Sequence, residues 1–174
     1  ELGAWDGMYL SNTLNLISAK GYKAVLIEGD KEKYRALVKN ISYQDVYKIC
    51  TYVSFDGDNT LDNILKTTPI PTDFDFLSVD IDGCDYYIFE SLRHYQPKIV
   101  CIEYNPSIPN EVDFVQSKDF SVKQGASAKS LIKLAAEKDY SPVAITECNL
   151  ILVRNELLKY VLVDRTLSLD DLRD

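Results

Sequence analysis

The stretch Phe76-Leu77-Ser78-Val79-Asp80-Ile81-Asp82-Gly83 decides the fold. Its short apolar run is typical of a strand that is buried on both faces, and the acidic residues and glycine that follow predict a turn. Beyond the turn, Ile88, Leu92 and Tyr95 recur at helical spacing. A buried strand followed by an amphipathic helix is the repeating unit of a parallel sheet covered by helices.

The same alternation of strand and helix extends along the chain in both directions. Further strands are predicted at Ala24–Glu28, Val46–Val53, Ile99–Tyr104, Pro142–Glu147 and Leu150–Val153. Helical stripes are formed by Leu10, Leu14 and Ile17; by Tyr34, Leu37 and Ile41; by Leu61, Ile64 and Leu65; and by Ala128, Leu131, Ile132 and Ala135. The last two strands are too close for a parallel crossover, so they form a hairpin. We therefore expect a doubly wound α/β fold, mostly parallel, with an antiparallel last strand.

Two segments stand outside this alternation. Residues 106–125 show no clear periodicity, and a long segment of this kind is either a substrate-facing loop or a plain insertion. The opening, Glu1-Leu2-Gly3-Ala4-Trp5-Asp6-Gly7, has the character of the turn that follows a strand. We expect the first strand to lie upstream, so that residues 1–174 form a single domain lacking N-terminal residues.

Composition and charge exclude several kinds of partner. The 174 residues, 46% of them apolar, suffice for one domain with a core. The net charge is −8, which disfavours nucleic acid and anionic membrane surfaces. No apolar run approaches the roughly 20 residues of a membrane-spanning helix, and no signal peptide is apparent. The four cysteines, two of them inside apolar runs (Cys50 and Cys101), are expected to be free, buried thiols in a reducing compartment, the cytoplasm.

Acidic residues and glycines follow the predicted strands, at the sheet edge where ligands bind in doubly wound folds. They are Glu1 with Gly3 and Gly7, Glu28 with Gly29, Asp80 with Asp82, and Glu103 with Asn105. Carboxylates at the first turn would repel a pyrophosphate, which disfavours an NAD or nucleotide-sugar enzyme. They favour a ligand that has a positive group and no phosphate, such as S-adenosylmethionine (SAM). Glu28 is placed to accept both ribose hydroxyls.

The order and spacing of these residues carry a family resemblance. Gly3-Ala4-x-x-Gly7, then Glu28 followed by Tyr34, Leu37 and Asn40, then Val79-Asp80-Ile81-Asp82-Gly83-x-Asp85, and finally Ile99-Val100-x-Ile102-Glu103 occur in this order. The pattern resembles the FkbM-like family of SAM-dependent methyltransferases, which have the Rossmann-like class I fold. In this sequence Trp5-Asp6 and Asp82 depart from the usual family pattern.

The resemblance implies a role for each matching residue. Glu1, Gly3, Ala4 and Gly7 would line the methionine side of SAM, and Glu28 would hold the ribose. Asp80 would lie near the reacting methyl group, and Phe55 and Asp56 would flank the adenine. The implied reaction is methyl transfer to a hydroxyl of a sugar, glycan or small natural product. The alternative is a binding or interaction module that keeps the fold without turnover, and no feature of the sequence indicates an oligomeric state.

An alcohol that accepts a methyl group must lose its proton. The only histidine, His94, is expected at the far end of its helix, away from the reacting edge. The base is then a carboxylate, with Asp80 and Asp82 as the catalytic candidates, a tyrosinate, or a metal-bound hydroxyl. Asp80, Asp82, Glu103 and Asn105 offer the oxygen ligands that a divalent metal prefers. A purely structural role in the turn is the remaining alternative. Cys84, at a predicted helix start, is expected to be a small pocket residue whose pKa could be lowered there.

Overall fold

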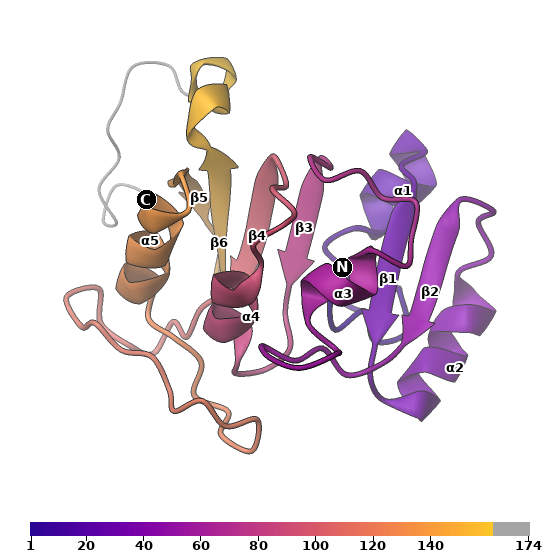
Figure 1. Cartoon of the computed structure of the whole chain (residues 1–174), viewed down its shortest axis with the longest axis horizontal. Helices are drawn as coiled ribbons and strands as arrows, with labels where there is room; N and C mark the ends of the chain where they lie inside the picture. The colour runs from indigo at the N-terminus through magenta and orange to yellow at the C-terminus, as the bar shows by residue number, and fades with distance from the viewer. Residues whose placement is uncertain (162–174) are drawn as a thin grey trace.

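The computed structural model describes residues 1–161 (Figure 1). Its strands are β1 (Ala24–Glu28), β2 (Val46–Cys50), β3 (Phe76–Val79), β4 (Ile99–Glu103), β5 (Tyr140–Ile145) and β6 (Asn149–Arg154). Its helices are α1 (Leu14–Lys20), α2 (Lys31–Asn40), α3 (Leu61–Leu65), α4 (Asp85–Ser91) and α5 (Ala128–Glu137), followed by a 3₁₀ helix at Asn155–Tyr160. Strands and helices alternate, as the sequence predicts.

Parallel strands make up most of the sheet. β1 pairs with β2 and β3 pairs with β4, in both cases in parallel. β6 runs antiparallel to β4 on one side and to β5 on the other, so the hairpin inserts its second strand between β4 and β5. The prediction of an antiparallel last strand is confirmed.

Leu2 joins the two halves of the sheet. It forms parallel bridges to Ile27 of β1 and Val79 of β3, and its backbone N–H donates to the Ser78 carbonyl at 3.0 Å. The strand order is therefore β2, β1, the short segment at Leu2, β3, β4, β6, β5. Next to Leu2, a cavity of about 730 Å³ lies between the first residues of β1 and β3, and α1 and the segment before β3 also line it.

Helices cover both faces of the sheet, so it is doubly wound. Figure 1 shows α3, α4 and α5 in front of the sheet and α1 behind it. Alternate side chains of β1 point to opposite faces. Val25 and Ile27 join the large cluster beneath α3, α4 and α5, whereas Leu26 joins the smaller cluster with Ile17 of α1 and Leu37 of α2.

Several element boundaries differ from the prediction. β2 ends at Cys50 because its partner β1 ends at Glu28 and the chain then turns away. Leu10 was expected on a helical stripe, but it precedes α1, has a φ of 52° and is 80% exposed. β5 begins two residues earlier than predicted, at Tyr140, and ends at Ile145. Helix 85–91 stops before Leu92, which nevertheless packs in the core.

All four cysteines are free thiols, as expected. Cys84 and Cys101 are buried, as predicted. Cys50 and Cys148 are exposed, because Cys50 ends the edge strand β2 and Cys148 lies in the turn between β5 and β6. None of the helices in residues 1–161 combines the length and apolar character that crossing a membrane requires.

Gly3 is required by close packing of backbone on backbone. Its φ is 69°, and a Cβ at this position would lie 1.8 Å from the Asp80 carbonyl oxygen. Gly21, which ends α1, has nearly the same φ of 70°, but a Cβ there would meet nothing within 4 Å. A substitution at Gly21 therefore measures the cost of the left-handed conformation alone, whereas one at Gly3 measures that cost together with the cost of a backbone clash.

We predict that Gly3→Ala lowers the free energy of unfolding by more than about 2 kcal/mol, because the end of β3 must move to admit the methyl group. Gly21→Ala is the matched control, and we expect it to cost only about 1 kcal/mol. Urea denaturation of both variants measures the difference. Equal losses in the two variants would contradict the packing of Gly3 against Asp80.

Candidate functional site

A cavity of about 810 Å³ opens at the sheet edge where β1, β3 and β4 end. Its floor is the turn after Leu2, and its sides are the segments that follow the strands. The sequence-predicted residues that line it are Glu1, Gly3, Ala4, Glu28, Gly29, Asp80, Asp82 and Glu103. The fold thus brings together most of the acidic rim that the sequence predicts, with residues drawn from four separate segments of the chain.

Glu28, the last residue of β1, holds the first turn in place. Its carboxylate accepts hydrogen bonds from the backbone N–H of Trp5 at 2.8 Å and from that of Asp30 at 2.7 Å. A carboxylate at the end of a strand is usually exposed, but Glu28 is only 7% exposed, because the turn around Trp5 folds over it. Its substitution would therefore disturb the turn as well as any bound ligand.

The Glu1 carboxylate organises the entry to α1. It accepts hydrogen bonds from the Ser11 hydroxyl at 2.8 Å, the Asn12 backbone N–H at 3.0 Å and the Thr13 hydroxyl. These bonds fix the segment that returns from the first turn to the helix. Glu1 thus lines the cavity and also supports one of its walls.

Three of the predicted cofactor residues lie outside the cavity lining. Gly7 packs against α2, since a Cβ there would lie 2.5 Å from Ile41 and 2.6 Å from Leu37. Phe55 is half-buried and packs against the large core cluster, and Asp56 is exposed. The lining on that side comes instead from the preceding residues Tyr52, Val53 and Ser54.

Asp80, Asp82 and Glu103 form an acidic cluster across the cavity from Glu28. One carboxylate oxygen of each lies within 4.8 Å of the others, which is close enough for a shared metal ion. Asn105 does not join them. Its side-chain oxygen accepts from the Ser107 N–H at 2.9 Å, and its amide donates to the Gln124 carbonyl.

The cluster favours protonated carboxyl groups. Burial, reinforced by Asp85, Asp80 and Asp82, raises the pKa of Glu103 to about 8, and Lys123 opposes the rise. Burial, with the charges of Asp82 and Glu1, also raises the pKa of Asp80. At neutral pH the Glu103 carboxyl is therefore mostly protonated, which suits a group that donates a hydrogen bond or releases a proton.

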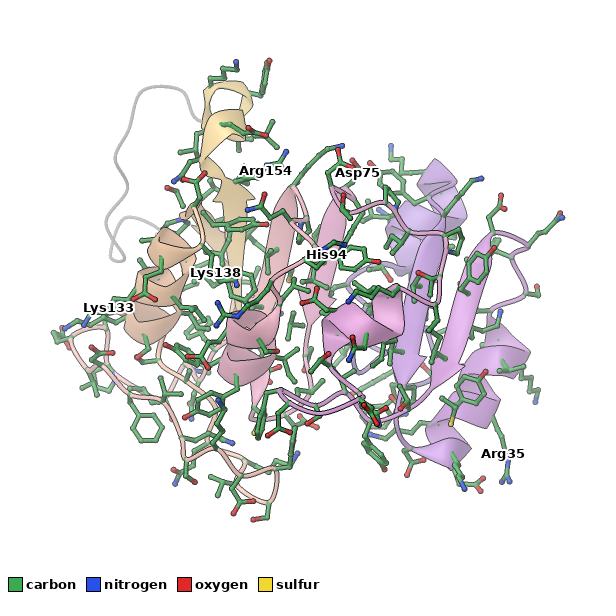
Figure 2. All side chains as sticks on the ribbon, in the orientation of Figure 1. Arg35, Asp75, His94, Lys133, Lys138 and Arg154 are labelled. Carbon is green, nitrogen blue, oxygen red and sulfur yellow. The ribbon has the colours of Figure 1, made fainter. Side chains whose placement is uncertain are left out.

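Two other candidates from the sequence are far from this chemistry. His94 does not line the cavity. Its backbone N–H donates to Asp62 of α3, and Figure 2 shows His94 near that helix. Cys84 is buried, and burial raises the pKa of its thiol, so the suggestion of a lowered pKa is wrong. The positive end of a short helix does not outweigh that desolvation.

The wall beyond the acidic cluster was not assigned residue by residue from the sequence. It consists of Phe120, Lys123 and Cys148. The first two come from the long segment after β4, and Cys148 lies between β5 and β6. Because residues 106–125 show no periodicity, the sequence identifies this segment as a long loop. No local pattern in it indicates that Phe120 and Lys123 are the side chains that reach the cavity.

Comparisons with known proteins bear on this geometry. Residues 57–141 match the family model of the methyltransferase FkbM domain, which confirms the resemblance over that part of the chain. Comparison with curated protein sequences gives no match. Among solved structures, LepI in complex with SAM is similar with a TM-score of 0.50 at 11% identity, over 88% of this chain and 42% of LepI.

Two further solved structures are similar with a TM-score of 0.49 at 13% identity. They are a pericyclic reaction enzyme and a LepI variant in complex with S-adenosylhomocysteine (SAH) and a substrate analogue. Each match covers 88% of this chain, which spans 42% and 41% of those proteins, respectively. At these identities the likeness to LepI concerns the fold alone.

The raised pKa of Glu103 predicts a pH-dependent stability. A carboxyl whose pKa is higher in the folded state stabilises the fold fully below its ordinary pKa, and this contribution is lost as the pH rises through about 8. As the pH rises from about 5 to about 9, we expect the wild type to lose at least about 1 kcal/mol more unfolding free energy than Glu103→Gln loses. This figure is already reduced to allow for the partial exposure of Glu103 to solvent.

Urea denaturation of the wild type and of Glu103→Gln, at about pH 5 and about pH 9, measures this difference in unfolding free energy. Glu147→Gln is the control, because Glu147 is exposed and lies outside the cluster. A wild type and a Glu103→Gln variant whose stabilities change with pH in parallel would contradict the interaction within the cluster.

Proposed function

We propose that the chain is a SAM-dependent methyltransferase that methylates a hydroxyl group on a sugar, glycan or small natural product, and that it acts in the cytoplasm. The observation that carries the proposal is one cavity with Glu28 on one side and the Asp80, Asp82 and Glu103 cluster on the other. The FkbM domain match over residues 57–141 supports the methyltransferase class, and the four free thiols support a reducing compartment.

The cavity suits SAM in size and charge. Its volume of about 810 Å³ lies in the range of cofactor sites. Glu28 uses each carboxylate oxygen for one backbone hydrogen bond, which leaves lone pairs to accept the ribose hydroxyls. Glu1, Asp80 and Asp82 add negative charge that favours a cation and opposes a pyrophosphate.

When bound, SAM supplies a methyl group on a positively charged sulfur. The chain contributes orientation and a proton acceptor. The acidic cluster would hold the acceptor hydroxyl by hydrogen bonds, and Asp80 or Asp82 would take its proton. Glu103 beside them, mostly protonated because its pKa is about 8, would donate a hydrogen bond to the neighbouring carboxylates.

A metal-assisted route is the second candidate, and the acidic cluster favours it. Three carboxylates within 4.8 Å of one another form the oxygen set that Mg²⁺ or Ca²⁺ prefers. Asp80, Asp82 and Glu103 would then hold the ion, and Asn105 would not, since its side chain points to the loop. Full activity in excess EDTA would exclude this route.

We predict that SAH binds to the wild type in calorimetric titration, and that Glu28→Gln weakens binding at least about tenfold, because one ribose acceptor becomes a donor. Glu147→Gln, the matched exposed control, should bind as the wild type does. Thermal unfolding of each variant distinguishes lost binding from a lost fold.

Absence of SAH binding to the folded wild type would overturn the proposal. Binding without production of SAH from SAM, over a panel of hydroxyl acceptors, would favour the non-catalytic module.

We also propose that the cavity beside Leu2 receives an extended segment that leads into Glu1 and completes the sheet. The Val25 carbonyl accepts from the Glu1 nitrogen at 2.9 Å, and the Ser78 carbonyl accepts from Leu2. In a strand the N–H and C=O of one residue point to the same side, so the N–H groups of Val25 and Ser78 face the cavity as well. A strand laid between β1 and β3 would pair with both.

We predict that a chain in which this segment precedes Glu1 unfolds at a higher temperature than residues 1–174, with slower hydrogen exchange at the Val25 and Ser78 amides. Exchange measured by NMR on both chains tests the pairing. The Leu152 amide on β6, which pairs with β4 and does not line this cavity, serves as the internal control. Unchanged exchange at Val25 and Ser78 would contradict the proposal.

A further inference from the structure

The segment after β4 ends in a loop, residues 116–125, that closes on itself. The Gln116 N–H donates to the Gly125 carbonyl at 3.0 Å, and Val115 and Ala126 form an antiparallel bridge beneath it. Gln116 is only 2% exposed, although its side chain is polar. A buried amide must find hydrogen-bond partners, and here they come from the loop itself.

The Gln116 side chain binds the loop from within. Its NH₂ group donates to the Val122 carbonyl at 3.0 Å and to the Asp119 carbonyl at 3.2 Å. Its oxygen accepts from the backbone N–H groups of Gln124 at 2.9 Å and Gly125 at 2.7 Å. One side chain thus replaces the regular backbone pairing that this loop lacks.

Two contacts fix Gln116 to the body of the domain. The Tyr87 hydroxyl, on α4, donates to the Gln116 carbonyl at 2.6 Å. The Gln116 NH₂ group also approaches the Cys84 sulfur at 3.3 Å. Gly83 leaves room for this contact, since a Cβ there would lie 2.7 Å from the Val122 carbonyl oxygen and 3.1 Å from the Gln116 side chain. The loop is therefore seated on the turn that follows β3.

The outer part of the loop faces the cavity. Phe120 and Lys123 line it, beyond the acidic cluster and opposite Glu28. The Phe120 ring stacks on Phe55, with ring centres 4.9 Å apart and planes 8° apart. Phe120 therefore supplies an apolar surface to the cavity, and Lys123 supplies a positive charge that acts on Glu103.

We propose that Gln116 is a positioning residue that holds Phe120 and Lys123 against the cavity as the wall that receives the methyl acceptor. Its anchoring role follows from the hydrogen bonds alone, whereas the acceptor role rests on the proposed function. The side chain would act through the loop, without touching the reactants.

The test uses Gln116→Met, which keeps the side-chain volume and removes all the side-chain hydrogen bonds to backbone. Gln124→Met is the matched control, because Gln124 is exposed in the same loop. We expect hydrogen exchange of the Gly125 amide to become at least about tenfold faster in Gln116→Met and unchanged in the control. Should Gln116→Met fail to fold, Gln116→Glu, which keeps the oxygen acceptor and loses the donors, is measured instead and should show an intermediate increase.

The acceptor role has a separate readout. With radiolabelled SAM and methyl α-D-glucoside as the probe acceptor, we expect Gln116→Met to raise the acceptor KM at least about fivefold, with calorimetric SAH affinity unchanged. Unchanged amide exchange would overturn the anchoring role, and faster exchange with an unchanged acceptor KM would overturn the acceptor role. A wild type that binds no SAH would instead refute the proposed function and leave the exchange result standing.

Discussion

The pairing of Leu2 with two strands at once is the constraint on which the rest of the structure depends. Through Ile27 and Val79, this single residue links the β1–β2 pair to the four strands on its other side. The same pairing places the turn at Gly3 against the Asp80 carbonyl and brings Trp5 over the Glu28 carboxylate. The cavity at the carboxyl edge of the sheet is therefore a consequence of how the sheet is joined.

The fold was predictable because its signals are local. Runs such as Ala24–Glu28 and Ile99–Glu103 are apolar and short, and each is followed by a helical stripe, so the doubly wound arrangement could be inferred from periodicity. Boundaries were less predictable, because a strand ends where its partner ends. Leu10 has the spacing of a helix residue, yet the Glu1 carboxylate holds residues 11–13 in a separate turn before α1 begins.

The site was predictable only in part. The acidic residues after the strands could be placed at one edge, since parallel strands end together. Burial could not be inferred, and it changes the chemistry: Glu28 lies beneath the first turn, and Glu103 has a pKa of about 8. The contributions of Phe120 and Lys123 depend on a loop whose order comes from one buried side chain, Gln116, and such an arrangement leaves no periodic pattern in the sequence.

The central claim is that the carboxyl-edge cavity, with Glu28 on one side and the acidic cluster on the other, is a SAM site. A crystal structure of the chain grown with SAH tests it most directly. The account predicts density for SAH in this cavity, with the ribose hydroxyls on the Glu28 carboxylate and the sulfur facing Asp80 and Glu103. Density for SAH elsewhere on the protein, or in this cavity with the ribose turned away from Glu28, would contradict the account.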